Sequence, residues 1–131
     1  MPARQLLAIV EVGGYPNFNP LYQKHGFSVE FVNSVRKAQG WLKKHCPDVV
    51  VTEFNFDAEF RDRMSNLESL LATMQRYRCD ARVIVLIEKP HLPRLEKVLQ
   101  RYSVFEVLLF PVDEVQLGGA LERAMQEEET S

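Results

Sequence analysis

Short runs of apolar residues alternate along the chain with segments in which apolar residues recur every three or four positions. Five runs have the length and the β-branched content of strands. They cover residues 6–12, 27–33, 49–52, 82–88 and 104–110. The run VVVT at 49–52 is apolar on both faces, which is typical of a central strand in a parallel sheet. The run at 27–33 alternates apolar and polar residues, as an edge strand does.

A helical pattern follows each run. The first predicted helix is short, with Asn19 as its N-cap, Pro20 at its first position and Gly26 as a left-handed C-cap. The second predicted helix runs from Val35 to about His45, and the fourth runs from Leu92 to about Tyr102. The third begins at the capping box SNLE at 65–68, and the fifth begins at a cap, Asp113. Strands that alternate with helices predict a three-layer, doubly wound α/β fold around a five-stranded parallel sheet.

The length and the composition of the chain limit the number of domains and the classes of function that it can have. We expect one domain over residues 1–126 and a frayed tail over 127–131. The net charge is −2, and the sequence therefore gives no indication of a basic surface that would bind nucleic acid directly. No apolar run approaches the ~18 residues of a membrane span, and the N-terminal segment has no small-residue cleavage site. We therefore expect a cytoplasmic protein without membrane contact, in which Cys46 and Cys79 are reduced thiols. A disulfide or a redox switch is the alternative for these cysteines.

In a parallel sheet of this kind, ligands and chemistry gather at the carboxyl ends of the strands. The residues at these ends are Glu11–Val12, Glu53–Phe54, Ile87–Glu88 and Phe110–Pro111. Candidate functional residues are therefore expected there first.

Three stretches carry a resemblance to a known family. AQGWLKKHCPDVVVTEFNF, RVIVLIE and VFEVLLFPVDEVQLGGALERAM resemble the receiver domain of bacterial two-component response regulators, and the likeness extends over nearly the whole chain. It implies a flavodoxin-like fold with strand order 2-1-3-4-5. In that family two acids end the first strand and a phosphoryl-accepting aspartate ends the third. A threonine or serine ends the fourth strand, and a lysine before a proline ends the fifth.

This chain departs from the family pattern at most of these positions. Glu53 stands at the phospho-acceptor position and Glu11 at the first acid, but Val12 replaces the second acid. Ile87 falls at the hydroxyl position, and Phe110 precedes Pro111 in place of the lysine. Because a metal ligand, the hydroxyl and the counter-charge are missing, the resemblance implies a pseudo-receiver that is not an enzyme and needs no cofactor, Mg²⁺ included.

Three interpretations of Glu53 remain open: a solvated acid at a strand end, a permanent imitation of the phosphorylated state, and an active phospho-acceptor. Its candidate charge partners are Lys89, Arg61 and Arg63. Glu11 and Glu53 together would make only a weak divalent-metal site. We further expect the Phe110–Pro111 bond to be cis, with the Phe110 ring filling the vacated pocket.

The resemblance implies a signalling module that acts through protein–protein contact, with a sensor kinase, an output protein or a second copy of the chain as partner. The expected interaction face draws on residues 92–102 and 113–126, where charges of both signs are interspersed. Its charged and polar members are Arg94, Glu96, Lys97, Arg101, Gln116 and Glu122. The two alternative functions are a metal-dependent phospho-receiver that uses Glu53, and a small-ligand sensor with a pocket around Val12, Ile87 and Phe110.

Overall fold

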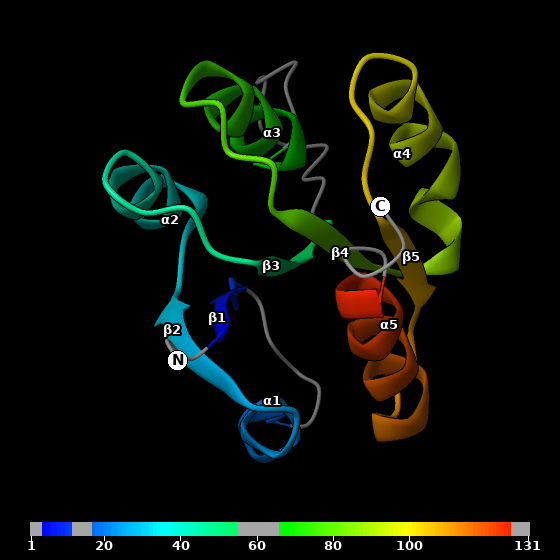
Figure 1. The fold of residues 1–131 in the computed structure, drawn as a ribbon. Helices are drawn as coiled ribbons and strands as arrows, with labels where there is room; N and C mark the ends of the chain where they lie inside the picture. The colour runs from blue at the N-terminus through cyan, green and yellow to red at the C-terminus, as the bar shows by residue number, and fades with distance from the viewer. Residues whose placement is uncertain (1–3, 12–16, 55–65, 127–131) are drawn as a thin grey trace.

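A computed structural model describes residues 4–11, 17–54 and 66–126 of the chain, and strands and helices alternate along them (Figure 1). The strands are β1 (Arg4–Ile9), β2 (Phe27–Val32), β3 (Val49–Glu53), β4 (Arg82–Ile87) and β5 (Glu106–Leu109). The helices are α1 (Asn19–Lys24), α2 (Val35–Leu42), α3 (Asn66–Arg76), α4 (Leu92–Leu99) and α5 (Glu114–Gln126), with a short 3₁₀ helix η1 (Lys89–His91) before α4.

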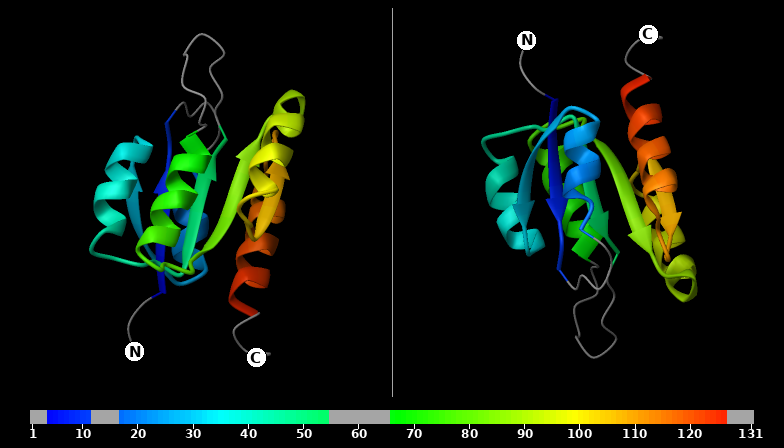
Figure 2. Two further views of the ribbon diagram at one scale, coloured as in Figure 1. Left: turned by 90° about the horizontal axis from the view of Figure 1, so that it is seen from above. Right: turned by 90° about the horizontal axis from the view of Figure 1, so that it is seen from below.

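All the strand pairs are parallel and the order across the sheet is β2-β1-β3-β4-β5, which confirms the predicted topology. Helices cover both faces (Figure 2). The core between the sheet and α1 and α5 contains Leu6, Val51 and Leu117, and the core under α2, α3 and α4 contains Leu7 and Val50. Every residue of β3 is buried, as the apolar run VVVT predicts for a central strand.

The observed element boundaries differ from the predicted ones at several ends. β1 begins and ends earlier than 6–12, and β5 is shorter than 104–110. Val104 and Phe105 precede β5 and still pack on the core. α2 ends at Leu42, so His45 lies in the loop beyond it. The predicted capping box begins at Ser65, which lies outside the described residues.

Two of the predicted helix caps are confirmed and one is wrong. Gly26 has φ 85°, the left-handed conformation expected of a C-cap glycine. The Asp113 side chain accepts a hydrogen bond from the backbone N–H of Gln116 at 2.8 Å and thereby caps α5. Asn19 is not the N-cap of α1, because it is already helical. The side chain of Asn17 instead accepts a hydrogen bond from the Asn19 N–H at 2.9 Å.

The expectation of two reduced thiols is wrong, because Cys46 and Cys79 form a disulfide with 5.5 Å between their Cα atoms. The two cysteines are 33 positions apart in the sequence. Cys46 precedes β3 and Cys79 precedes β4, and these two strands are neighbours in the parallel sheet. Parallel pairing places both loops at the amino end of the sheet, and this proximity is not visible in the spacing of the residues.

Within the part of the chain that the structure describes, no helix has the length and apolar character needed to cross a membrane.

Candidate functional site

Glu53 is the last residue of β3, and its side chain is turned into the protein. Only 3% of its surface is exposed, so the interpretation as a solvated acid is wrong. Its Oε2 accepts a hydrogen bond from the backbone N–H of Glu11 at 3.0 Å. A buried carboxylate requires such donors because removing its charge from water is costly. Glu53 therefore links the carboxyl ends of β3 and β1 through a charge-assisted hydrogen bond.

Glu11 lies just beyond β1 and is partly exposed, so the two acids of the predicted site come together at one edge of the sheet. The contact between them joins a backbone N–H to a carboxylate. Among the described residues, no three His, Cys, Asp or Glu side chains gather where they could hold a metal ion. The pairing of Glu11 with Glu53 as a weak metal site stays a hypothesis.

The ends of β4 and β5 are apolar. Ile87 is fully buried under α4 at 0% exposure, and its carbonyl accepts a hydrogen bond from the Phe110 N–H at 2.9 Å. Phe110 is partly buried against the opposite core, beside α5. The Phe110–Pro111 bond is cis, as predicted. The residues at these two positions offer neither a hydroxyl nor a cation to the end of β3.

The proposed charge partners of Glu53 are only partly described. Lys89 is exposed in η1 and, within the described ranges, forms no ion pair with Glu53. Arg61 and Arg63 lie outside the described residues, as does Val12. The structure thus brings together Glu11, Glu53 and the neighbouring strand ends.

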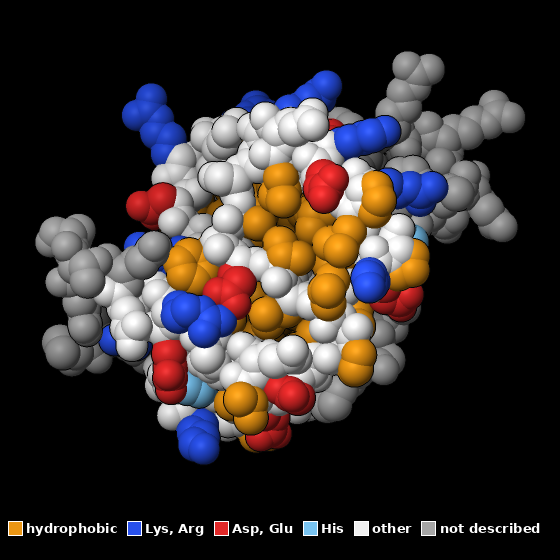
Figure 3. Space-filling model, turned by 90° about the vertical axis from the view of Figure 1, so that its right-hand side faces the viewer, with side chains coloured by type: hydrophobic (Ala, Val, Ile, Leu, Met, Phe, Trp, Pro, Cys, Tyr) orange, Lys and Arg blue, Asp and Glu red, His pale blue; other side chains and the backbone are white. Residues whose placement is uncertain are grey.

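A second candidate site is the face formed by α4, β5 and α5. Figure 3 shows apolar side chains gathered across its centre, with charged side chains around them. Large hydrophobic residues are exposed on each of the three elements: Leu99 of α4 (36%), Leu109 of β5 (38%) and Val115 (84%) of α5. Because β5 is the last strand in the order, an edge of the described sheet runs through this face between α4 and α5 (Figure 1).

Charged residues of both signs surround the apolar centre. Arg123 of α5 donates to both carboxylate oxygens of Glu106 in β5, with Nε to Oε1 at 2.9 Å. The hydrogen bond to Glu106 raises the pKa of the Arg123 guanidinium. The predicted members of the face are all exposed: Arg94, Glu96, Lys97, Arg101, Gln116 and Glu122. The exposure of Leu99, Leu109 and Val115 was not predictable from the sequence, because each fits a helix or strand pattern whether or not the core covers it.

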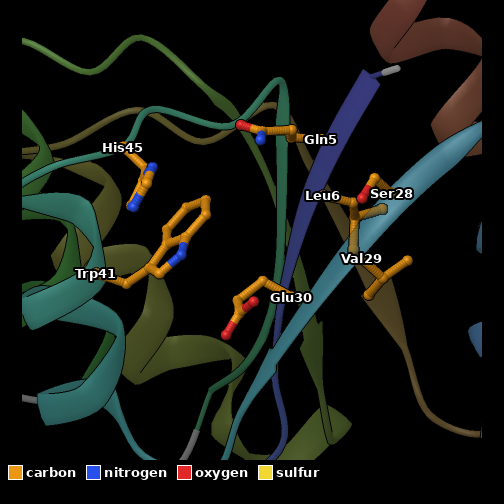
Figure 4. Close-up of a pocket in the computed structure, with 7 residues that line it drawn as sticks. All are labelled: Gln5, Leu6, Ser28, Val29, Glu30, Trp41 and His45. Carbon is orange, nitrogen blue, oxygen red and sulfur yellow. The ribbon is translucent and has the colours of Figure 1, made fainter. Parts of the chain in front are cut away.

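A groove of about 230 Å³ lies on the opposite side of the molecule, between α2 and the strands β1 and β2 (Figure 4). The Trp41 and His45 rings form one wall and stack with 4.6 Å between their centroids. Gln5, Ser28 and Glu30 contribute polar groups from the two strands. The sequence did not predict this groove, because its walls come from three segments that only the fold brings together.

Comparison with known proteins supports the fold. No model of a known protein family matches the sequence, and no curated protein matches it. The structure is similar to the signal receiver domain of an HD domain-containing protein from Pseudomonas fluorescens Pf-5, with TM-score 0.75, 16% identity, and coverage of 99% of this chain and 100% of that one.

Two further solved structures are similar, both with TM-score 0.73. One is a response regulator receiver domain protein from Clostridium thermocellum, at 21% identity and covering 97% of this chain and 98% of that chain. The other is a sensor protein from Polaromonas sp. JS666, at 23% identity, and the match covers 96% of this chain and 98% of that chain. The chain therefore has the flavodoxin-like fold of response regulator receiver domains, over nearly its whole length.

Proposed function

We propose that this chain is a receiver-like signalling module that acts through protein–protein contact and does not use aspartyl phosphorylation. The observation that carries the proposal is the exposure of a large apolar side chain on each element of the α4–β5–α5 face, namely Leu99, Leu109 and Val115, together with the apolar side chains at the centre of this face in Figure 3. Exposed apolar residues that cluster and are ringed by charge are typical of interaction surfaces. Such a module is non-enzymatic and belongs in the cytoplasm.

The surroundings of Glu53 support the second half of the proposal. A phospho-acceptor must present its oxygen to an incoming phosphoryl group, whereas Glu53 is 3% exposed and accepts a hydrogen bond from Glu11. Ile87 and Phe110 supply neither the hydroxyl nor the cation that phosphoryl transfer uses. The same burial argues against Glu53 as an exposed imitation of a phosphoryl group.

The partner that suits this face best is a second copy of the chain. It carries exposed charges of both signs: Arg94, Glu96 and Lys97 lie on α4, Arg101 lies just beyond α4, and Glu122 lies on α5. A surface with both signs can pair with itself around a two-fold axis. A sensor kinase or an output protein would use the same apolar centre.

Sedimentation at increasing protein concentration tests this proposal. Val115→Lys and Leu109→Lys should weaken self-association, because each replaces an exposed apolar side chain with a charge that the contact would have to bury unpaired. Tyr77→Lys is a matched control, because Tyr77 is 40% exposed at the end of α3 and away from this face. A wild-type chain that stays monomeric, or a dimer that is equally weakened by Tyr77→Lys, would contradict the proposed self-association.

Incubation with acetyl phosphate and Mg²⁺ tests the absence of phosphorylation. We expect the intact mass to stay unchanged, in the wild type and in Glu53→Gln alike. A stoichiometric phosphoryl adduct on Glu53 would overturn this part of the proposal and favour a metal-dependent phospho-receiver. Saturable binding of a coloured or aromatic compound near Ile87 and Phe110 would favour a ligand sensor instead.

A further inference from the structure

The two ends of the disulfide lie in different environments. Cys46 belongs to an exposed stretch, residues 43–46, whereas Cys79 is only 9% exposed and packs in the core under α2, α3 and α4. A nucleophile from solvent must approach one of the two sulfur atoms along the S–S axis. Since access helps to decide which sulfur is attacked, Cys46 is the accessible end of this disulfide.

The buried end is held by the end of a helix. The Cys79 N–H donates to the Met74 carbonyl at 2.8 Å and the Arg78 N–H donates to the Gln75 carbonyl at 3.1 Å. Arg78 between them has φ 54°. These features form a Schellman motif at the end of α3, with Cys79 at the position that turns back onto the helix. Cys79 is thus fixed by the backbone independently of its bond to Cys46.

The surface around Cys46 suits a negatively charged nucleophile. Lys43, Lys44 and His45 precede it directly and are all exposed, while Asp48 lies two residues beyond it. The Asp48 Oδ2 accepts a hydrogen bond from the Gln5 N–H at 2.8 Å, so this nearby carboxylate is bound to the beginning of β1. Positive charge next to a cysteine attracts thiolates and stabilises the thiolate that is released there.

A groove also lies beside the residue that precedes Cys46 in the chain. His45, the residue covalently before Cys46, forms a wall of the groove of about 230 Å³ that Figure 4 shows. Trp41 forms the same wall and stacks on His45. Trp41 therefore provides a spectroscopic reporter next to the loop that carries Cys46.

From this asymmetry we infer that the Cys46–Cys79 bond is a reversible thiol–disulfide exchange site, with Cys46 as the attacked sulfur and a cellular thiol as the co-substrate. An incoming thiolate forms a bond to the Cys46 Sγ, the Sγ–Sγ bond breaks, and Cys79 leaves as a thiolate that takes a proton from water. A second thiolate then attacks the sulfur of the co-substrate and releases Cys46 as a thiolate, which also takes a proton from water. The chain gains two electrons and two protons, and two thiols are oxidised to one disulfide.

The inference accounts for a disulfide in a chain that we expect to be cytoplasmic, where such bonds are usually transient, catalytic or redox-sensing. The buried Cys79 must leave as an anion at the C-terminal end of α3, where the helix dipole disfavours negative charge. The mixed disulfide on Cys46 should therefore re-close readily, and a trapping reagent is needed to observe it. The site lies at the amino end of the sheet, away from Glu53 and from the α4–β5–α5 face.

Opening the bond should leave the two helices packed together. The Gln39 side chain of α2 donates to the Thr73 hydroxyl at 2.9 Å and to the Ser69 carbonyl at 3.2 Å, and both partners lie in α3. The apolar core below these helices contains Cys79, but its other members, such as Leu42 and Leu70, are not joined through the disulfide. Exchange is therefore expected in the folded chain, without unfolding.

The test uses the oxidised wild-type chain in native buffer. Reduced glutathione is added in one arm, and reduced thioredoxin with its reductase in the other, followed by a rapid alkylating quench and peptide mass spectrometry. We expect complete reduction in at least one arm, a glutathionyl group on Cys46 and none on Cys79, unchanged far-ultraviolet circular dichroism, and altered Trp41 fluorescence. Reduction by glutathione would show that a small thiol is a sufficient co-substrate. Reduction in the thioredoxin arm only would show that the co-substrate is a protein dithiol.

Matched single-cysteine variants give a second readout. Cys79→Ser leaves the exposed Cys46, and Cys46→Ser leaves the buried Cys79. Glutathione disulfide should modify Cys46 faster than Cys79 by an order of magnitude or more, because Cys79 is shielded from solvent. A bond that opens only in denaturant, or a glutathionyl group on Cys79 of the wild type, would overturn the inference. Neither outcome bears on self-association, so the two proposals fail separately.

Discussion

At the scale of single residues, Glu53 is where the structure changes the interpretation most. The side chain stands at the position of a phospho-acceptor, yet it is buried and engaged with the end of β1. A carboxylate that accepts a backbone N–H in a shielded place is part of the architecture. We interpret Glu53 as an internal connection between β1 and β3.

This interpretation predicts the effect of truncating Glu53. Glu53→Ala should lower the free energy of unfolding by about 1–3 kcal/mol, because the Glu11 N–H loses its acceptor. Glu53→Gln should cost less, since its carbonyl oxygen can still accept that bond. Urea denaturation measures both values. Glu88→Ala removes an exposed acid at the end of β4 and serves as the control. If Glu53→Ala and Glu88→Ala lowered the free energy of unfolding equally, the structural role of Glu53 would be contradicted.

Tyr22 gives a pH-dependent prediction. Burial raises the pKa of the Tyr22 hydroxyl well above its ordinary value, and the side chain is 3% exposed. The neutral form is therefore favoured in the folded chain. Below the ordinary tyrosine pKa of about 10, both states hold the proton and this contribution to stability is fully present. As the pH rises above that value, the unfolded chain ionises first and the contribution is lost.

The wild type should therefore lose about 1 kcal/mol more stability than Tyr22→Phe between about pH 10 and pH 11. Denaturation curves at the two pH values measure this difference directly. Parallel losses in the two proteins would show that Tyr22 does not ionise differently in the folded and unfolded chains.

At the scale of elements, the ends of the helices differ in how local sequence determines them. Asp113 and Ser34 cap α5 and α2 by accepting hydrogen bonds from the backbone N–H groups three residues on. These caps arise from short-range chemistry. The end of α3 is different, because an arginine, Arg78, adopts the left-handed conformation that glycine usually provides.

Arg78→Gly should raise the free energy of unfolding by about 1 kcal/mol, because the left-handed conformation costs a residue with a Cβ atom roughly that much. Arg76→Gly, within the same helix end, should instead lower it by about 1 kcal/mol. Thermal denaturation of the two variants separates the effects. The same sign for both would show that the conformation of Arg78 imposes no cost.

At the scale of the whole molecule, the disulfide restricts the unfolded chain as well as the folded one. It closes a loop of 33 residues. Loop-closure entropy predicts that removing this restriction costs about 3–4 kcal/mol. The oxidised chain should unfold at correspondingly higher urea concentration than the fully reduced chain.

A double variant, Cys46→Ser with Cys79→Ser, should unfold at the concentration of the reduced wild type and should not respond to reductant. Equal stability of the oxidised and reduced wild type would contradict a cross-link that is formed in the native structure.

The order of strands and helices was predictable because it follows from periodicity that each segment carries in its own residues. The central position of β3 and the edge pattern of β2 follow from the same property. The candidate residues Glu11, Glu53, Ile87 and Phe110 were also predictable in position, since a parallel sheet places its carboxyl ends at one edge. Their burial was not, because burial depends on which neighbours close over a strand end.

The sequence by itself therefore determined the α/β class, the strand order implied by its resemblance to receivers, and the absence of receiver residues at Ile87 and Phe110. Only the tertiary structure decided that Glu53 is buried, that Leu99, Leu109 and Val115 are exposed, and that Cys46 meets Cys79. The physical reason is the range of the interactions. Periodicity and capping act within a few residues, whereas burial, surface patches and disulfides depend on segments that are distant in the chain and adjacent only after folding.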